Sequence, residues 1–192
     1  KVSCCLNSKL NQLKNERALL QQLKSKNSKE FAFKTLVNDY KERLYWHIRK
    51  IVISHDDADD VLQNTFIKIF KNLDSFKGDS KLFTWMYRIA TNEAITFLKS
   101  KAKRNQVSNE RLNELSLQNL EADVYFEGNE IQLKLQKAIA QLPKIQQLVF
   151  NMRYFDEIKY KDMSEILETS EGALKASYHI AVKKIKSYLN FN

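Results

Sequence analysis

The chain has 192 residues, of which 43% are hydrophobic, and this length can form one domain core or two small ones. Its three glycines and single proline exclude most β-rich folds, because the turns of such folds depend on these residues. The formal net charge of +9 favours a polyanionic partner such as nucleic acid, since lysine and arginine neutralise phosphates and release counterions. A basic surface that is merely solvated explains the charge about equally well.

The charge is distributed unevenly along the chain. Residues 15–104 carry 18 basic against 11 acidic side chains and residues 129–192 carry 10 against 7, whereas residues 105–128 carry one against five. The two cysteines, Cys4 and Cys5, are adjacent and cannot join distant parts of the chain, which favours a reducing compartment. Since no apolar run approaches the ~20 residues of a membrane span and no signal-peptide core is found, we expect a cytoplasmic protein.

The first large basic block, residues 15–104, is predicted to be helical, because apolar residues recur at intervals of three and four. Four aspartates between His55 and Val61 suit a helix N-terminus, where free N–H groups and the helix dipole favour negative charge, and this capping role explains them fully. Residues 74–80 contain Gly78 and are predicted to form a loop. The predicted helices cover residues 16–24, 31–53, 55–73 and 82–99.

Residues 105–128 are acidic and rich in Asn, Glu and Gln, which predicts a linker between two helical parts. Helices resume at Asn129. Pro143 is expected to be the first residue of a helix that runs through Met152, because the first turn of a helix does not need the N–H that proline lacks.

The last part of the chain predicts a helix-turn-helix. Residues 160–167 form a short amphipathic helix, residues 168–170 a turn, and Ser170 caps a longer helix over residues 171–189. In DNA-binding examples the second helix enters the major groove and its first residues reach base edges. A plain pair of antiparallel helices has the same pattern. The predicted fold is all-α, with two small helical domains joined by the acidic linker.

Several short motifs occur in order along the chain. They are Leu19-Leu20 with Phe31, residues 59–66 (DDVLQNTF), residues 76–80 (FKGDS), residues 84–92 (TWMYRIATN), Leu142-Pro143, and the terminal helix-turn-helix. Together they resemble the extracytoplasmic-function (ECF) group of bacterial sigma factors, within the sigma-70 superfamily. The resemblance implies an N-terminal extension (1–14), sigma region two (15–104), the linker (105–128) and the helix-turn-helix sigma region four (129–192).

The resemblance implies an alternative sigma factor rather than an enzyme, with no catalytic residue, cofactor, metal or small-molecule substrate. Such a protein binds core RNA polymerase, at its clamp coiled coil and flap, and directs promoter-specific transcription initiation. Region two would bind the polymerase and would recognise and melt the minus ten element, and region four would read the minus thirty-five element. The expected partners are core RNA polymerase, promoter DNA and an anti-sigma factor.

The family's polymerase contacts correspond here to Asp60, Gln63 and Asn64. These side chains are expected to point away from the apolar stripe of Val61, Phe66 and Ile69. Relatives usually carry glutamate where Asn64 stands, so this chain lacks one negative charge at that position.

The loop at residues 76–80 resembles the family's element that captures a base flipped out of the non-template strand of the minus ten element, and extruding a base costs a few kcal/mol. Basic side chains would contact phosphates, which adds affinity but little sequence specificity. Trp85 and Tyr87 could stack on single-stranded DNA, but aromatic residues at helical spacing are more often core, and we assign Trp85 to the core. The implied minus ten set consists of a pocket wall (Phe76), residues opposite it (Ile89, Asn92, Thr96) and flanking residues (Lys77, Ser80, Arg88, Lys99, Lys103, Arg104).

In region four the resemblance places contacts with the minus thirty-five element on the second helix of the helix-turn-helix. Lys175 is best suited to contact a guanine, and Glu171 could accept a hydrogen bond from a cytosine amine. Leu174 and Ile185 are expected to pack inside. The implied set is Glu171, Gly172, Lys175, Ala176, His179 and Lys183.

Two departures from the family pattern concern region four, and one ambiguity concerns the linker. Glu168 stands where such turns usually have glycine, so a left-handed backbone there would cost about 1 kcal/mol. Ile180 and Val182 stand where relatives often carry arginine, which predicts weaker binding to the minus thirty-five element. The acidic linker is expected to enter polymerase channels that otherwise hold RNA, although a solvated tether explains its composition equally well.

Two other classes of protein share features with this sequence. His55-Asp56 is a dipeptide found at metal sites of helical phosphohydrolases, but such sites need further ligands, and His47 and His179 are the only other histidines. No phosphate-binding glycine loop, nucleophile elbow or zinc-ligand spacing occurs. A one-component helix-turn-helix transcription regulator is the closer alternative; it would bind operator DNA alone, whereas a sigma factor needs core polymerase.

Overall fold

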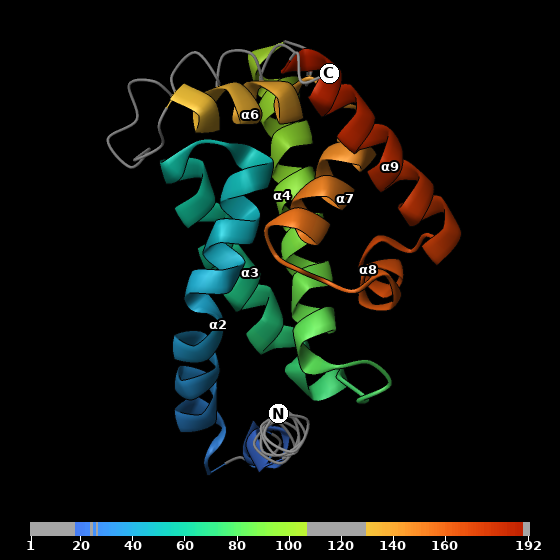
Figure 1. Ribbon diagram of the computed structural model, residues 1–192. Coiled ribbons are helices and arrows are strands. Elements are labelled where there is room, and N and C mark those ends of the chain that lie inside the picture. Colours follow the sequence, from blue (N-terminus) through green and yellow to red (C-terminus); the bar gives the residue numbers. More distant parts are fainter. Residues whose placement is uncertain (1–17, 24, 26, 107–129, 190–192) are drawn as a thin grey trace.

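The computed structural model describes residues 18–23, 25, 27–106 and 130–189, and Figure 1 shows how they are arranged. These residues are mostly helical and include no strand, which confirms the predicted all-α fold. The N-terminal extension and nearly all of the predicted linker lie outside the described residues. After the helical residues 18–23, the elements are α2 (Lys29–Val52), α3 (His55–Asn72), the short 3-10 helix η1 (Leu73–Ser75), α4 (Leu82–Asn105), α6 (Glu130–Ala140), α7 (Lys144–Tyr154), α8 (Tyr160–Leu167) and α9 (Glu171–Tyr188).

The helices α2, α3 and α4 pack against one another and form the α2–α4 group. A tight connection separates α2 from α3: Ile53 adopts a φ of 68°, and the Ser54 hydroxyl caps α3 by accepting a hydrogen bond from the Asp57 N–H at 3.4 Å. The apolar stripes of the three helices then meet in one core. Its fully buried residues include Leu36, Leu44, Ile48, Ile69, Met86, Ala90 and Ala94.

Helix α4 continues to Asn105, past the predicted end at Lys99. The additional turns are held by contacts with α3: the ammonium of Lys101 lies 2.5 Å from the Asp57 carboxylate, and Ala102 is buried. These partners are 44 residues apart in the sequence, so local periodicity does not reveal them.

The helices α6 to α9 form the second part of the structure, the α6–α9 group. Pro143 is the N-cap of α7 and not its first helical residue, because its ψ of 145° is extended and only its carbonyl joins the helix, accepting from Gln147 at 3.0 Å. A small core closes this group, made of Ala138, Ile139, Leu142, Phe150, Ala181 and Ile185.

The predicted helix-turn-helix is present as α8 and α9. The Ser170 hydroxyl accepts a hydrogen bond from the Ala173 N–H at 3.3 Å, as its capping role predicts. Glu168 ends α8 in the left-handed conformation, with a φ of 52°, which is the geometry expected to cost about 1 kcal/mol where the turn glycine is missing. Leu174 and Ile185 are buried, as expected.

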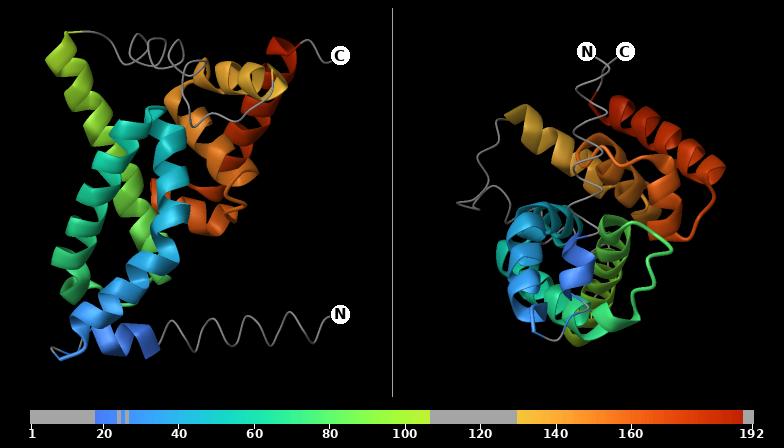
Figure 2. Two further views of the ribbon diagram at one scale, coloured as in Figure 1. Left: turned by 90° about the vertical axis from the view of Figure 1, so that its left-hand side faces the viewer. Right: turned by 90° about the horizontal axis from the view of Figure 1, so that it is seen from below.

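The two groups lie side by side, with α7 and α8 packed on α2 and α4 (Figure 2). Their main core is continuous: buried residues of the α6–α9 group, namely Leu148, Val149, Met152, Ile158, Met163, Ile166 and Leu174, belong to the same cluster as those of the α2–α4 group. The position of α8 on α4 therefore follows from apolar packing as well as from polar contacts.

Candidate nucleic-acid and protein interfaces

The predicted polymerase-binding residues lie together on the outer face of α3. Asp60, Gln63 and Asn64 are exposed, whereas Val61 and Ile69 of the apolar stripe are buried and Phe66 is half-buried. Ile67, four residues after Gln63, continues the same face and is 51% exposed. Sequence reasoning missed Ile67, although the spacing of 60, 63, 64 and 67 could have revealed it.

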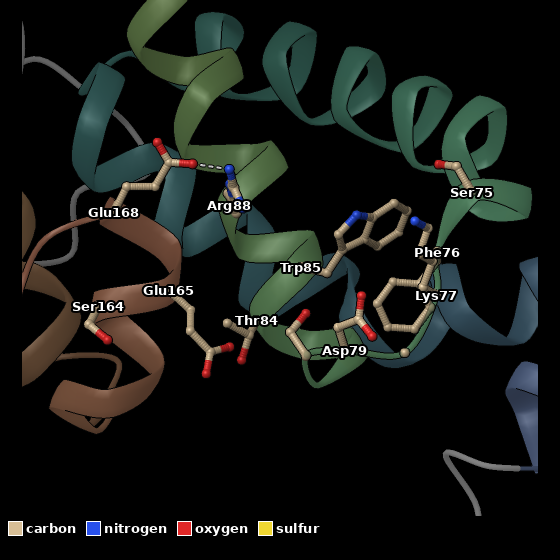
Figure 3. Close-up of a pocket in the computed structure, with 12 residues that line it drawn as sticks. Ser75, Phe76, Lys77, Asp79, Thr84, Trp85, Arg88, Ser164, Glu165 and Glu168 are labelled. Atoms are coloured by element: carbon tan, nitrogen blue, oxygen red, sulfur yellow. Dashed lines mark hydrogen bonds and ion pairs between the residues drawn. The ribbon is translucent and has the colours of Figure 1, made fainter.

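The loop after η1 and the first turns of α4 line a cavity of about 520 Å³ (Figure 3). Phe76 is only 6% exposed, and its ring packs on that of Trp85 at a centroid distance of 5.0 Å. The third side of the cavity comes from α8. The lining residues are Ser75 to Ser80, Thr84, Trp85, Arg88, Ser164, Glu165 and Glu168.

The structure brings part of the predicted minus ten set together at this cavity, namely Phe76, Lys77, Ser80 and Arg88. It does not place Ile89, Asn92 or Thr96 in the lining: Ile89 is half-buried, and Asn92 and Thr96 are exposed further along α4. They lie on or close to the same face of α4 as Trp85 and Arg88, but further along the helix, beyond the residues that line the cavity. The remaining members, Lys99, Lys103 and Arg104, are exposed near the C-terminal end of α4.

The two aromatic residues of α4 that could stack on DNA have different surroundings. Tyr87 is 1% exposed and lies between the rings of His47 and Phe83, so it is a core residue. Trp85 is half-buried and packs against the main core, as predicted, but it also lines the cavity. A core assignment for Trp85 is therefore incomplete.

The predicted minus thirty-five residues share the outer face of α9. Glu171, Gly172, Lys175, Ala176, His179 and Lys183 are all exposed, and the opposite face is buried. The ammonium of Lys175 lies 3.9 Å from the Glu171 carboxylate and 5.7 Å from the ring centroid of Tyr160. No atom lies within 4 Å of a Cβ built on Gly172, so this chain by itself does not require a glycine there.

A polar cluster that the sequence did not predict joins the two groups. Asp156, which follows α7, accepts from Lys50 at 2.5 Å with one carboxylate oxygen, and its other oxygen is 3.0 Å from Nδ1 of His47. Nε2 of His47 is 2.9 Å from the Thr91 hydroxyl. Burial alone would raise the pKa of Asp156, but its hydrogen bonds and charge interactions with His47 and Lys50 hold that pKa below the usual value.

Further polar contacts join α7 to the C-terminal end of α2. The Lys144 ammonium donates to the Ile51 carbonyl at 3.2 Å, and the Asn151 amide donates to the Lys50 carbonyl at 3.4 Å. Both carbonyls belong to the last turn of α2, where carbonyl groups have no N–H partner within the helix. Burial lowers the pKa of Lys144 to about 8.

Two ion pairs join α8 to α4 and its N-cap. The Lys81 ammonium lies 2.7 Å from the Asp162 carboxylate, and the Arg88 guanidinium is paired with Glu168 (Figure 3). No local pattern predicts these pairs, because the partners are about 80 residues apart.

In the described part of the chain, no three His, Cys, Asp or Glu side chains are placed to hold a metal ion. In those same ranges, none of the helices combines the length and apolarity that crossing a membrane requires.

Comparisons with known proteins agree with this architecture. The family model for Sigma-70 region 2 matches residues 36–104, and the model for Sigma-70 region 4 matches residues 132–185. The ECF RNA polymerase sigma factor SigW of Bacillus subtilis is 30% identical, over 82% of this chain and 89% of its own. The ECF RNA polymerase sigma-E factor of Haemophilus influenzae is 25% identical, over 90% of this chain and 94% of its own.

Two solved structures have the same fold. CnrH, in complex with the cytosolic domain of CnrY, covers 91% of this chain with a TM-score of 0.67 and 21% identity, and 97% of its own chain is matched. The sigma factor RpoE of Bartonella quintana, in complex with the anti-sigma factor NepR, covers 83% with a TM-score of 0.65 and 19% identity, and 98% of its chain is matched. The region models and the curated relatives make this chain a member of the ECF group of sigma-70 factors, an alternative sigma factor that binds core RNA polymerase and directs promoter-specific transcription initiation.

Proposed function

We propose that this sigma factor has no catalytic chemistry of its own and acts through three separate surfaces. The exposed face of α3 binds the polymerase, the loop with α4 holds the minus ten element, and α9 reads the minus thirty-five element. The observation that carries the proposal is that the predicted residues on α3 and α9 are exposed together on one face of each helix, opposite a buried face. Because polymerase and promoter are its partners, we infer that it works in the cytoplasm.

The proposed polymerase surface combines an apolar centre with a polar surround. Ile67 supplies the apolar side chain, and Asp60, Gln63 and Asn64 supply polar groups beside it. Protein interfaces commonly have this arrangement, in which a few central residues contribute most of the binding free energy. Asn64 keeps hydrogen-bonding capacity at the position where relatives carry a charge.

The proposed minus ten surface is built on the Phe76–Trp85 ring pair. Stacking on an aromatic ring contributes about 1–3 kcal/mol per base, which can offset the few kcal/mol needed to extrude a base. Lys77 and Arg88 lie at the same cavity and would contact the phosphates. Asn92, which is exposed and outside the cavity lining, would hydrogen-bond a base edge further along α4.

The proposed minus thirty-five surface is the outer face of α9. Lys175, His179 and Lys183 follow one another at intervals of four on this face, and all are exposed. The separation of 3.9 Å between Lys175 and Glu171 is too long for a hydrogen bond, so the lysine can turn to a guanine.

We further propose that an anti-sigma factor holds this protein when it is inactive. Support comes from the two solved structures of the same fold, each of which is a complex: RpoE with the anti-sigma factor NepR, and CnrH with the cytosolic domain of CnrY.

The function is tested with core RNA polymerase and purified full chain. Mapping transcription starts after overexpression identifies the promoter, and run-off transcription then requires both components. Gln63→Ala with Ile67→Ala should weaken core binding by about tenfold or more, while Lys34→Ala, on the exposed side of α2, should not. Unchanged affinity in the double variant would remove α3 from the interface. Tight, specific binding of promoter DNA by the chain alone would favour a one-component regulator.

A further inference from the structure

The outer face of α9 is divided lengthwise into two edges with different chemistry. The helix lies at the outside of the structure (Figure 1). A polar edge runs along one side of the face at intervals of four and consists of Lys175, His179 and Lys183. An apolar edge runs along the other side at intervals of three and four and consists of Ala173, Ala176 and Ile180. All six residues are exposed, so packing within the chain explains neither edge.

Ile180 is the one large side chain of the apolar edge. It is 45% exposed, whereas Leu174 and Ile185 on the opposite face of α9 are buried. A single exposed apolar residue is common on protein surfaces. Ile180 is informative because it lies on the helix face that is proposed to enter the major groove, one turn after Ala176, where its neighbours would be base edges.

The chemistry of the major groove limits what an apolar edge can contact there. Every base pair presents hydrogen-bonding atoms in this groove, and the C5 methyl group of thymine is its apolar group. An isoleucine side chain cannot replace the water on a cytosine amine or a guanine carbonyl, so burying those atoms against it is unfavourable. Contact with a thymine methyl group removes apolar surface from water on both sides and is favourable.

We propose that Ile180 and Ala176 pack on the methyl groups of two neighbouring thymines, and so make A·T pairs part of the minus thirty-five sequence that this chain reads. Residues four apart on a helix are separated by about 6 Å along its axis, so the two side chains together reach across neighbouring base pairs, which are ~3.4 Å apart. This inference rests on the proposed role of α9 as the reader of the minus thirty-five element.

The two edges then contribute differently to recognition. Lysines of the polar edge contribute affinity through charge, and contacts with phosphates carry no sequence information directly. Ile180 contributes discrimination, because its side chain is β-branched and stiff in a helix and therefore loses little conformational freedom when it contacts a base. Removing one buried methyl group weakens binding about fourfold, which is small for affinity but distinguishes thymine from the other bases at that position.

The test removes the methyl groups and nothing else. Deoxyuridine pairs with adenine as thymidine does but lacks the C5 methyl group, and it is placed at one thymine of the minus thirty-five element at a time, on either strand. Binding is measured with the full chain assembled on core polymerase, at the promoter found by mapping transcription starts. At two neighbouring positions the substitution should weaken binding of the parent about three- to fivefold. With Ile180→Ala, the loss at one of them should fall below twofold.

Two further variants separate the methyl contact from a general loss of binding. Ile180→Val keeps a branched apolar side chain and should retain most of the parent's sensitivity to deoxyuridine. Lys183→Ala removes a charge from the polar edge and should weaken binding to the thymine and uracil duplexes by the same factor, so that their ratio stays that of the parent. Both residues are exposed, and circular dichroism confirms that each variant is folded.

Three outcomes overturn the inference. The first is a minus thirty-five element without neighbouring thymines, and the second is a parent that binds the thymine and uracil duplexes equally. The third is an Ile180→Ala variant with the parent's full sensitivity, because another side chain would then contact the methyl groups. Each outcome is obtained with polymerase that does bind the promoter, so the sigma function stands in all three. Failure of the assembled polymerase to bind any promoter instead overturns the proposed function.

Discussion

The two helices proposed to contact promoter DNA are presented differently by the free chain. On α9 the predicted residues from Glu171 to Lys183 are exposed, whereas the first turns of α4 lie under α8 and Arg88 is paired with Glu168. The far end of α4 is open again, with Lys103 exposed. The difference teaches that exposure alone does not identify a binding surface. A basic side chain held by a carboxylate from another part of the chain can mark one equally well.

A shared core joins the two groups. Substitutions in this core should have the largest effect on stability. Leu36 in α2 and Leu174 in α9 are fully buried in that core. Replacing either with alanine should lower the free energy of unfolding by about 2–5 kcal/mol, and each change should shift one common transition in urea denaturation. Phe31→Ala, at a residue 74% exposed, should change little. Two transitions, each moved by only one substitution, would show that the groups unfold independently.

Because the outer face of α9 is exposed, the loss of a single contact there should directly weaken promoter binding. Lys175→Ala should weaken promoter occupancy by about 1–3 kcal/mol, because it removes a base contact that needs no rearrangement of the chain. Lys184→Ala removes the same charge from the other side of the helix and serves as control. Footprinting of the polymerase complex measures both. A footprint of Lys175→Ala identical to that of the control would remove Lys175 from the contacts.

Much of this arrangement follows from local sequence signals. The bounds of α8, the cap at Ser170 and the buried positions of Leu174 and Ile185 were all predictable, since capping and periodicity act over a few residues. The residues of the α3 surface were predictable for the same reason, including Ile67, whose spacing from Gln63 and Asn64 places it on the same face.

The contacts between the groups could not be predicted in the same way. His47 and Asp156 are 109 residues apart, and neither is unusual among its neighbours in the sequence. The extent of the cavity has a similar origin: Phe76 packs on Trp85 and holds the loop at the first turns of α4, so Asn92, about two turns beyond Trp85 on the same face, lies outside the lining. Only tertiary packing decides which face of α4 the loop and α8 approach.

The junction between α7 and α2 predicts a dependence of stability on pH. Burial lowers the pKa of Lys144 to about 8, while the unfolded chain keeps an ordinary lysine. Between that pH and about 10.4 the unfolded state binds more protons, so stability should rise with pH in this window, and below it the buried charge is fully unfavourable.

Lys144→Met should therefore raise the free energy of unfolding at pH 7 by roughly 1–2 kcal/mol, since removing the buried charge outweighs the lost hydrogen bond to the Ile51 carbonyl. The difference from the parent should shrink by pH 10, as measured by urea denaturation at both values. Lys34→Met, at an exposed position in α2, is the control. A difference that does not vary with pH would mean that Lys144 is solvated in the folded chain.

The smallest effect is expected at Glu168, where two substitutions distinguish backbone strain from the contact between the groups. Glu168 has a φ of 52° and also pairs with Arg88. Glu168→Ala and Glu168→Gly both remove the ion pair, so its loss cancels when the two variants are compared. Only glycine relieves the left-handed residue, so Glu168→Gly should be more stable than Glu168→Ala by about 1 kcal/mol in urea denaturation. Equal stabilities would mean that the turn tolerates a side chain without strain, and that the missing glycine has no structural cost in this sigma factor.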